Sequence, residues 1–112
     1  MSINWNDYRK DLLGNIGELA AEIPETMKGY KLLADSANKQ GILDKKTQEL
    51  ISLAVAVTTR CDGCISIHTN EALKAGASKQ EISAALAVAI SLNAGAALVY
   101  SSHVIDAIGE SH

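Results

Sequence analysis

The stretch from Glu49 to His68 reads ELISLAVAVTTRCDGCISIH, and the expected fold and chemistry of the chain both centre on it. Its first part, to about Thr58, is apolar on all sides of a helix, and Asp44 is a good N-cap for that helix. A helix that is apolar on every side is buried on every side. In a chain of 112 residues, part of that cover is expected from another subunit.

Cap and turn residues divide the rest of the chain into further helices. The signals are Pro24 as a helix stop, Gly41 and Gly76 as C-terminal caps, the capping box Ser78-Lys79-Gln80-Glu81, and a break at Asn93 and Gly95. No window alternates convincingly as a half-buried strand does. We therefore expect an all-α fold of about six helices, near residues 4–22, 25–39, 44–58, 61–74, 78–92 and 96–108.

The composition is that of a single domain, residues 1–112, in a soluble cytoplasmic protein. The chain is 47% hydrophobic, yet it has no Phe and one Trp, so its core is thin and an oligomer is expected. A net charge of −3 without a basic stripe argues against nucleic acid. The N-terminus lacks the layout of a signal peptide. The apolar stretch Ile82–Val99 is interrupted and rich in Ala, short of the roughly 20 strongly apolar residues of a membrane span.

Cys61 and Cys64 begin the helix that follows the turn. Cysteines at i and i+3 lie on one helix face and can form a reversible disulfide. The partial positive charge and free N–H groups at a helix start favour the nucleophilic thiolate. This spacing therefore predicts a reactive thiol beside a resolving thiol.

His68 and Glu49 are the expected proton carriers for this pair. His68 shares a helix face with Cys61 and Cys64, where it can take a thiol proton. If the two helices pack antiparallel, Glu49 and His68 lie about 15 Å and 10 Å from the turn, at about 1.5 Å per residue. The two side chains then meet, and the carboxylate orients the imidazole and raises its basicity.

The pattern Glu49-x11-Cys61-x2-Cys64-x3-His68 resembles the signature of AhpD-like alkylhydroperoxidases, within the carboxymuconolactone decarboxylase superfamily. The segments LDKKTQELISLAVA, from Leu43, and EALKAGAS, from Glu71, are also similar to that family, and the resemblance runs from about residue 44 to 105.

The resemblance implies an all-helical trimer or hexamer that reduces hydroperoxides. It implies Cys64 as the peroxidatic thiol, Cys61 as the resolving thiol, and Glu49 and His68 as the proton relay. A lipoylated protein or another dithiol donor restores the thiols. No metal or flavin is required, and a substrate pocket is expected beside Ile65 and Ile67.

One departure from the family pattern keeps other functions open. Better-studied peroxidases of the family often carry a histidine directly before the second cysteine, where this chain has Gly63. Gly63 favours a general dithiol–disulfide carrier with little peroxidase activity. A lactone decarboxylase is a third reading, although it has no need of two thiols, and a non-enzymatic redox sensor is a fourth.

Two further readings concern a zinc site and the role of His103. A zinc site needs four ligands, and Cys61, Cys64 and His68 do not supply them. His103 replaces the missing relay histidine only if it packs against the site; otherwise it is a core or interface residue.

Overall fold

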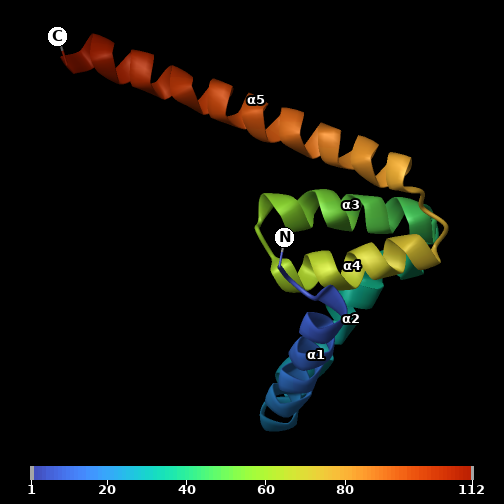
Figure 1. The fold of residues 1–112 in the computed structure, drawn as a ribbon. Coiled ribbons are helices and arrows are strands. Elements are labelled where there is room, and N and C mark those ends of the chain that lie inside the picture. The colour runs from blue at the N-terminus through green and yellow to red at the C-terminus, as the bar shows by residue number, and fades with distance from the viewer. Residues whose placement is uncertain (1, 112) are drawn as a thin grey trace.

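A computed structural model describes residues 2–111, and within that range the chain forms five helices and no strand. The all-α prediction is therefore confirmed. The helices are α1 (Trp5–Glu22), α2 (Pro24–Gln40), α3 (Lys45–Thr58), α4 (Asp62–Lys74) and α5 (Lys79–Ser111) (Figure 1).

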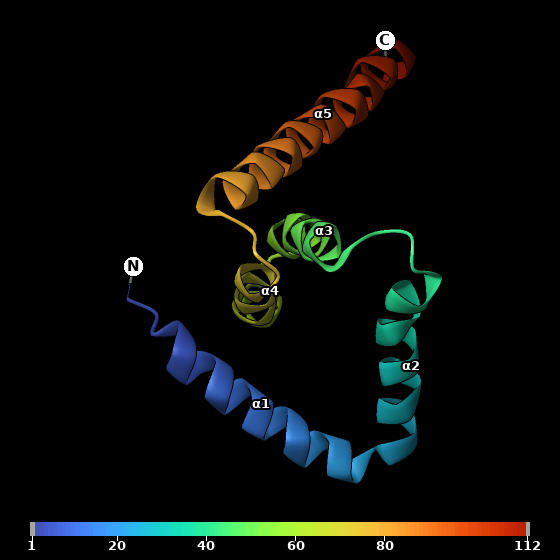
Figure 2. The same cartoon turned by 90° about the vertical axis from the view of Figure 1, so that its right-hand side faces the viewer.

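The centre of the molecule is the helical hairpin of α3 and α4, which lie side by side in Figures 1 and 2. Leu53 of α3 and Ala72 of α4 are buried together with Ala77, and Leu50 and Ile82 pack against them. These are small side chains, so the core is thin, as the composition predicted. It holds α3 against α4, and both carry the residues of the expected site.

The predicted caps are present. Asp44 accepts a hydrogen bond from the Thr47 amide at 2.8 Å. Ser78 and Glu81 form the reciprocal capping box, with each side chain 3.0 Å from the other residue's amide nitrogen. Gly41 and Gly76 have φ of 67° and 89°, a left-handed conformation that glycine adopts without steric cost. Local side-chain chemistry thus sets where α2 ends and where α3 and α5 begin.

The predicted break at Asn93 and Gly95 is wrong, because α5 is continuous from Lys79 to Ser111. The Asn93 side chain donates to the carbonyl of Ala89 at 2.7 Å and to Thr58 Oγ1 at 2.9 Å. A side chain held in this way does not compete with the helical backbone. Gly95 lowers the stability of the helix by about 1 kcal/mol relative to Ala. The surrounding alanines, which favour the helix most strongly, offset this loss.

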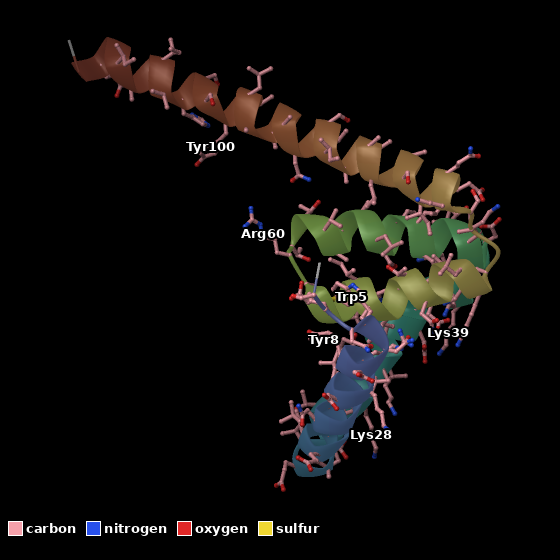
Figure 3. All side chains as sticks on the ribbon, in the orientation of Figure 1. Trp5, Tyr8, Lys28, Lys39, Arg60 and Tyr100 are labelled. Atoms are coloured by element: carbon pink, nitrogen blue, oxygen red, sulfur yellow. A yellow bond between two sulfur atoms is a disulfide. The ribbon has the colours of Figure 1, made fainter. Side chains whose placement is uncertain are left out.

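The molecule is open rather than compact. The α1–α2 pair and the C-terminal half of α5 extend away from the α3–α4 hairpin (Figures 1 and 2). The radius of gyration is 18.3 Å, whereas a compact domain of this length has about 13 to 14 Å. Figure 3 shows Tyr100 on the extended part of α5, where it is 74% exposed.

The continuous α5 also changes the reading of its apolar stretch. By length and composition, Lys79–Glu110 suffices to cross a membrane, with a mean hydropathy of 2.0 over one 18-residue window. Only 6% of that window is buried within the described residues. Only the predicted interruption of this stretch is wrong, because the helix is continuous.

The contribution of the capping box to the stability of α5 can be tested by substitution. We expect Ser78→Ala to lower the free energy of unfolding by about 1 kcal/mol, because the Glu81 amide loses its acceptor. Urea unfolding at a fixed protein concentration measures the loss. Ser83→Ala, on the exposed part of the same helix, is the matched control. Equal stabilities for the two variants would contradict a structural role for the box.

Candidate active site

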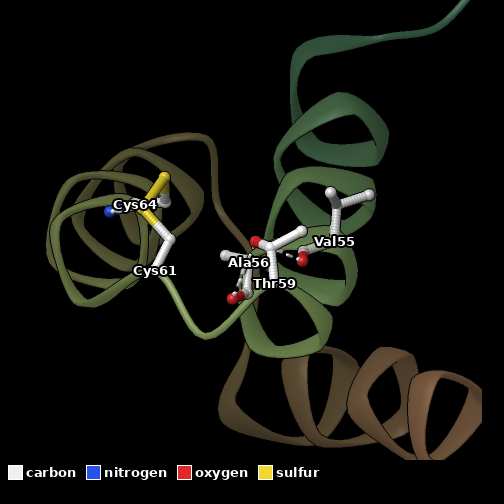
Figure 4. Close-up of a disulfide and its surroundings, with 5 residues drawn as sticks. All are labelled: Val55, Ala56, Thr59, Cys61 and Cys64. Carbon is white, nitrogen blue, oxygen red and sulfur yellow. Dashed lines mark hydrogen bonds between the residues drawn. A yellow bond between two sulfur atoms is a disulfide. The ribbon is translucent and has the colours of Figure 1, made fainter. Parts of the chain in front are cut away.

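The two cysteines lie at the first turn of α4, as predicted, and form a disulfide (Figure 4). Cys61 is the N-cap, and its Sγ accepts a hydrogen bond from the Cys64 amide at 3.1 Å. The Cα atoms of the pair are 5.2 Å apart. After reduction, a thiolate at this place faces the unpaired N–H groups and the partial positive charge of the helix start, both of which stabilise it.

The turn from α3 into α4 determines where Cys61 lies. The Cys61 amide donates to the carbonyl of Ala56 at 3.0 Å, and the Thr59 amide donates to Val55 at 2.9 Å (Figure 4). Arg60, between them, has φ of 55° and points away from the hairpin in Figure 3. An L-residue in this left-handed region costs roughly 1–2 kcal/mol. The hydrogen bonds around the turn hold Arg60 there, and they place Cys61 directly after α3.

Glu49 and His68 meet across the hairpin, as their distances from the turn predicted. His68 Nδ1 lies 2.6 Å from Glu49 Oε2. Glu49 is only 3% exposed, whereas the His68 side chain is 34% exposed. Because an ionised carboxylate only accepts hydrogen bonds, Nδ1 carries the proton of the shared bond. Nε2 of a neutral His68 is then the nitrogen that can accept a proton.

Lys45 also binds this carboxylate, and sequence reasoning missed it. Its Nζ is 2.8 Å from Glu49 Oε1, the oxygen that His68 does not use. The available signal was the spacing of four residues on α3, which brings the two side chains together. Such pairs are common on exposed helix surfaces, so the spacing alone does not distinguish this one.

The charge of Glu49 results from opposing effects. Burial acts to raise the pKa of Glu49, but the hydrogen bonds from Lys45 and His68 outweigh it, and the pKa lies below the ordinary value of 4.5. The hydrogen bond to Glu49 raises the pKa of Lys45. Both shifts favour the charged forms, so Lys45 and Glu49 form an ion pair at neutral pH.

Cys64 and His68 line the same pocket, which has a volume of about 290 Å³. The rest of its wall comes from α3 and its C-cap residue: Ile51, Ser52, Val55, Ala56 and Thr59. Ile65 and Ile67, which the sequence analysis expected beside the substrate pocket, do not line this pocket. Ile65 lines a different pocket, between α1 and α4, together with Trp5. The reason is that α3, rather than the face of α4 that carries Ile65, lies beside Cys64.

Gly63 is in close contact with α1. A Cβ atom at this position would lie 2.8 Å from Leu12 Cδ2. A larger side chain therefore needs Leu12 to move, and a histidine here competes with the packing of α1 on α4. His103 does not take its place, because it lies on the extended part of α5, where its ring contacts Tyr100 with centroids 4.7 Å apart.

Comparison with known proteins identifies the family. The model of the carboxymuconolactone decarboxylase family matches residues 24–107. An uncharacterized protein of Haemophilus influenzae is 49% identical over 107 residues, which are 96% of this chain and 95% of that one. The chain therefore belongs to the carboxymuconolactone decarboxylase family, as the resemblance in its sequence indicated.

Solved structures and an alkylhydroperoxidase add to this result. The apo crystal structure of a carboxymuconolactone decarboxylase family protein from Legionella pneumophila matches with a TM-score of 0.75 and 36% identity, over 95% of both chains. A protein from Methanobacterium thermoautotrophicum matches with a TM-score of 0.73 and 34% identity, over 80% of this chain and 97% of that one. The alkyl hydroperoxide reductase AhpD of Coxiella burnetii is 45% identical over 51 residues, 46% of this chain and 29% of that protein.

The lowered pKa of Glu49 gives a pH-dependent prediction. Its ionisation stabilises the fold above the ordinary pKa of 4.5, and this contribution disappears as the pH falls from 4.5 through the lower pKa of the folded state. We expect Glu49→Gln to lower the free energy of unfolding by about 1–3 kcal/mol at neutral pH, because charged hydrogen bonds are lost. The difference from wild type, measured by urea unfolding, should shrink below pH 4.5.

Other carboxylates do not obscure this test. Asp44 and Glu81 also have lowered pKa values, each from hydrogen bonds first, to Thr47 and to Lys46 respectively. Both carboxylates are present in the wild type and in Glu49→Gln, so their contributions cancel in the difference between the two free energies of unfolding. A difference that stays constant from neutral to acid pH would show that the charge of Glu49 does not stabilise the fold.

Proposed function

We propose that this member of the carboxymuconolactone decarboxylase family is a thiol-dependent peroxidase that reduces organic hydroperoxides. The observation that carries the proposal is the hydrogen bond of Glu49 to His68, whose ring lines the same pocket as Cys64. A nucleophile, a base and a group that orients the base are thereby present together. The match to AhpD over 51 residues supports the same chemistry.

In the proposed first half-reaction, the Cys64 thiolate attacks the outer oxygen of a hydroperoxide. The O–O bond breaks, Cys64 becomes a sulfenic acid, and the alkoxide leaves. His68, which took the thiol proton through Nε2, returns it to the leaving oxygen, so an alcohol is released. Glu49 stabilises the imidazolium that exists between these two proton transfers.

The Cys61 thiol then attacks the sulfur of the sulfenic acid. An S–S bond forms, the S–O bond breaks, and water leaves with the Cys61 proton. The product is the Cys61–Cys64 disulfide of this structure. A dithiol donor, such as a lipoylated protein, reduces it by exchange and is itself oxidised to a disulfide. We place this cycle in the cytoplasm, where such donors keep thiols reduced.

The pocket favours hydroperoxides that carry an apolar group. Apart from Ser52 and Thr59, its α3 wall consists of Ile51, Val55 and Ala56. Apolar walls bind an alkyl chain and exclude water from the reacting sulfur. Organic hydroperoxides are therefore preferred over hydrogen peroxide in this proposal.

A second candidate is a general dithiol–disulfide oxidoreductase. The contact of Gly63 with Leu12 favours it, because the family histidine expected at this place is absent and α1 occupies the space. The two candidates differ in one half-reaction. A carrier exchanges its disulfide with other thiols but does not consume peroxide.

We also propose that a second copy of the chain covers α5. Leu98, Val99, Val104 and Ile105 of α5 are 60–76% exposed within the described residues. An apolar surface of this extent marks an interface. The polar residues Asn93, Ser101 and His103 within α5 favour a protein surface over lipid.

Hydroperoxide turnover tests the peroxidase proposal. We expect the reduced protein, with dihydrolipoamide as donor, to consume cumene hydroperoxide, and Cys64→Ser to abolish turnover. Glu49→Gln should lower kcat by about 10²-fold, the smaller effect usual for a disturbed proton relay. Glu25→Gln on the surface of α2, whose partner Lys28 is 3.3 Å away, is the matched control and should keep full activity.

The opposite outcome separates the two candidates. If the wild-type protein exchanges its disulfide with dihydrolipoamide at a normal rate but leaves the peroxide unchanged, the protein is a carrier and the peroxidase proposal is wrong.

Light scattering after size-exclusion chromatography tests the assembly. We expect a homo-oligomer in detergent-free buffer, and a shift to smaller species in Leu98→Glu/Val104→Glu, because two charges enter an apolar contact. Lys10→Glu on α1 is a control for added negative charge. A wild-type protein that stays monomeric, or that is soluble only in detergent, would refute the proposed cover of α5.

A further inference from the structure

Glu49 has a partner on each of its two oxygens, and only one of them belongs to the proposed proton relay. His68 binds Oε2 at 2.6 Å, and Lys45 binds Oε1 at 2.8 Å. The carboxylate is 3% exposed, while the Lys45 side chain is 52% exposed. A buried charge therefore sits between an imidazole and an ammonium group that remains in contact with water.

We propose that Lys45 is a positioning residue for the Glu49–His68 pair, which holds the carboxylate ionised and directs its second oxygen to His68. The proposal rests on the proposed function, in which this pair exchanges protons with Cys64. Lys45 acts through Glu49 and not on the substrate. It lines a separate pocket of about 370 Å³ with Glu49 and His68, whereas Cys64 lines the pocket on α3 described above.

The role of Lys45 follows from the balance of charge around Glu49. Burial favours the neutral acid, and a carboxylate with no cation beside it would hold the relay proton too tightly. A fixed positive charge on Oε1 keeps Glu49 ionised, so that Oε2 remains an acceptor for His68 Nδ1. Lys45 supplies that charge at little desolvation cost, because its own side chain is half exposed.

The geometry of α3 makes this arrangement specific. Lys45 lies one turn before Glu49, so the ion pair runs along the helix and leaves Oε2 for the neighbouring helix. Asp35 of α2 and Glu71 of α4 also face Lys45, and their negative charges raise its pKa further and favour its charged form. The groups that face Glu49 are Lys45 on its own helix and His68 on α4.

Lys46 provides the matched control. It is the next residue on α3, and its Nζ binds Glu81 Oε2 at 2.8 Å, at the start of α5. The two lysines thus make ion pairs of equal length. One binds the buried carboxylate beside His68, and the other binds a half-exposed carboxylate of a capping box.

The test measures the reactivity of Cys64 without any peroxide. In a reduced Cys61→Ser background, only Cys64 reacts with iodoacetamide, because the chain has two cysteines. The alkylation rate against pH gives the midpoint for thiolate formation. Without Lys45, Glu49 is more readily protonated, and a neutral Glu49 no longer stabilises the His68 imidazolium that forms together with the Cys64 thiolate. We therefore expect Lys45→Met to move the midpoint up by about 0.5–1 pH unit, a three- to tenfold loss of rate below the midpoint.

Three comparisons decide the outcome. Lys45→Arg should restore the wild-type profile, Lys46→Met should not move it, and the effect of Lys45→Met should largely vanish in a Glu49→Gln background. Circular dichroism checks that each variant is folded, and Lys45→Gln replaces Lys45→Met if the latter is not. A Lys45→Met profile that superimposes on that of the parent, or an equal shift in Lys46→Met, overturns the proposal.

The alkylation test is independent of peroxidase activity. If no hydroperoxide is consumed but the Lys45→Met shift is present, the peroxidase proposal fails and the role of Lys45 stands. If turnover is present and the shift is absent, the peroxidase proposal stands and Lys45 is only a surface ion pair.

Discussion

The structure depends on one buried carboxylate between two helices. Glu49 is 3% exposed on a helix that is otherwise mostly apolar, so its charge requires compensation from within the protein. His68 and Lys45 supply it, at 2.6 and 2.8 Å. His68 can reach Glu49 only when α3 and α4 pair in one register. That register brings Cys64 and His68 to one pocket, so the charge balance of a single side chain links the fold to the chemistry.

The remainder of the chain surrounds this hairpin without enclosing it. α1 closes one side through the contact of Leu12 with Gly63 and the hydrogen bond from Ser66 to the Trp5 carbonyl, at 3.4 Å. α5 begins with the capping box and is tied to α3 by Asn93 and Thr58, and then extends freely. The core of this hairpin is thin, with Leu53, Ala72 and Ala77 at its centre. The assembly proposed above would cover the exposed apolar side chains of α5.

The features that could be predicted from the sequence depend on residues that are close together in the chain. The caps at Asp44, Gly41 and Ser78 follow from side chains a few residues apart, and the disulfide at the start of α4 follows from the Cys spacing. The meeting of Glu49 and His68 follows from the rise per residue of two helices joined by a short turn. Each of these needs only neighbouring sequence or one hairpin.

The features that sequence reasoning missed depend on contacts between distant segments. The continuity of α5 depends partly on a hydrogen bond from Asn93 to Thr58, 35 residues away. The wall of the Cys64 pocket depends on which helix lies beside α4, and the contact of Gly63 depends on where α1 lies. Lys45 was missed for another reason: its spacing to Glu49 is common, and only burial makes the pair exceptional.

The central claim is that Cys64 is the thiol that a hydroperoxide oxidises. Mass spectrometry of the reduced Cys61→Ser protein, treated with equimolar cumene hydroperoxide in the presence of dimedone, tests it most directly, because dimedone traps a sulfenic acid before it reacts further. The account predicts a single dimedone adduct, located on Cys64. An unmodified Cys64 thiol after the peroxide treatment would contradict it.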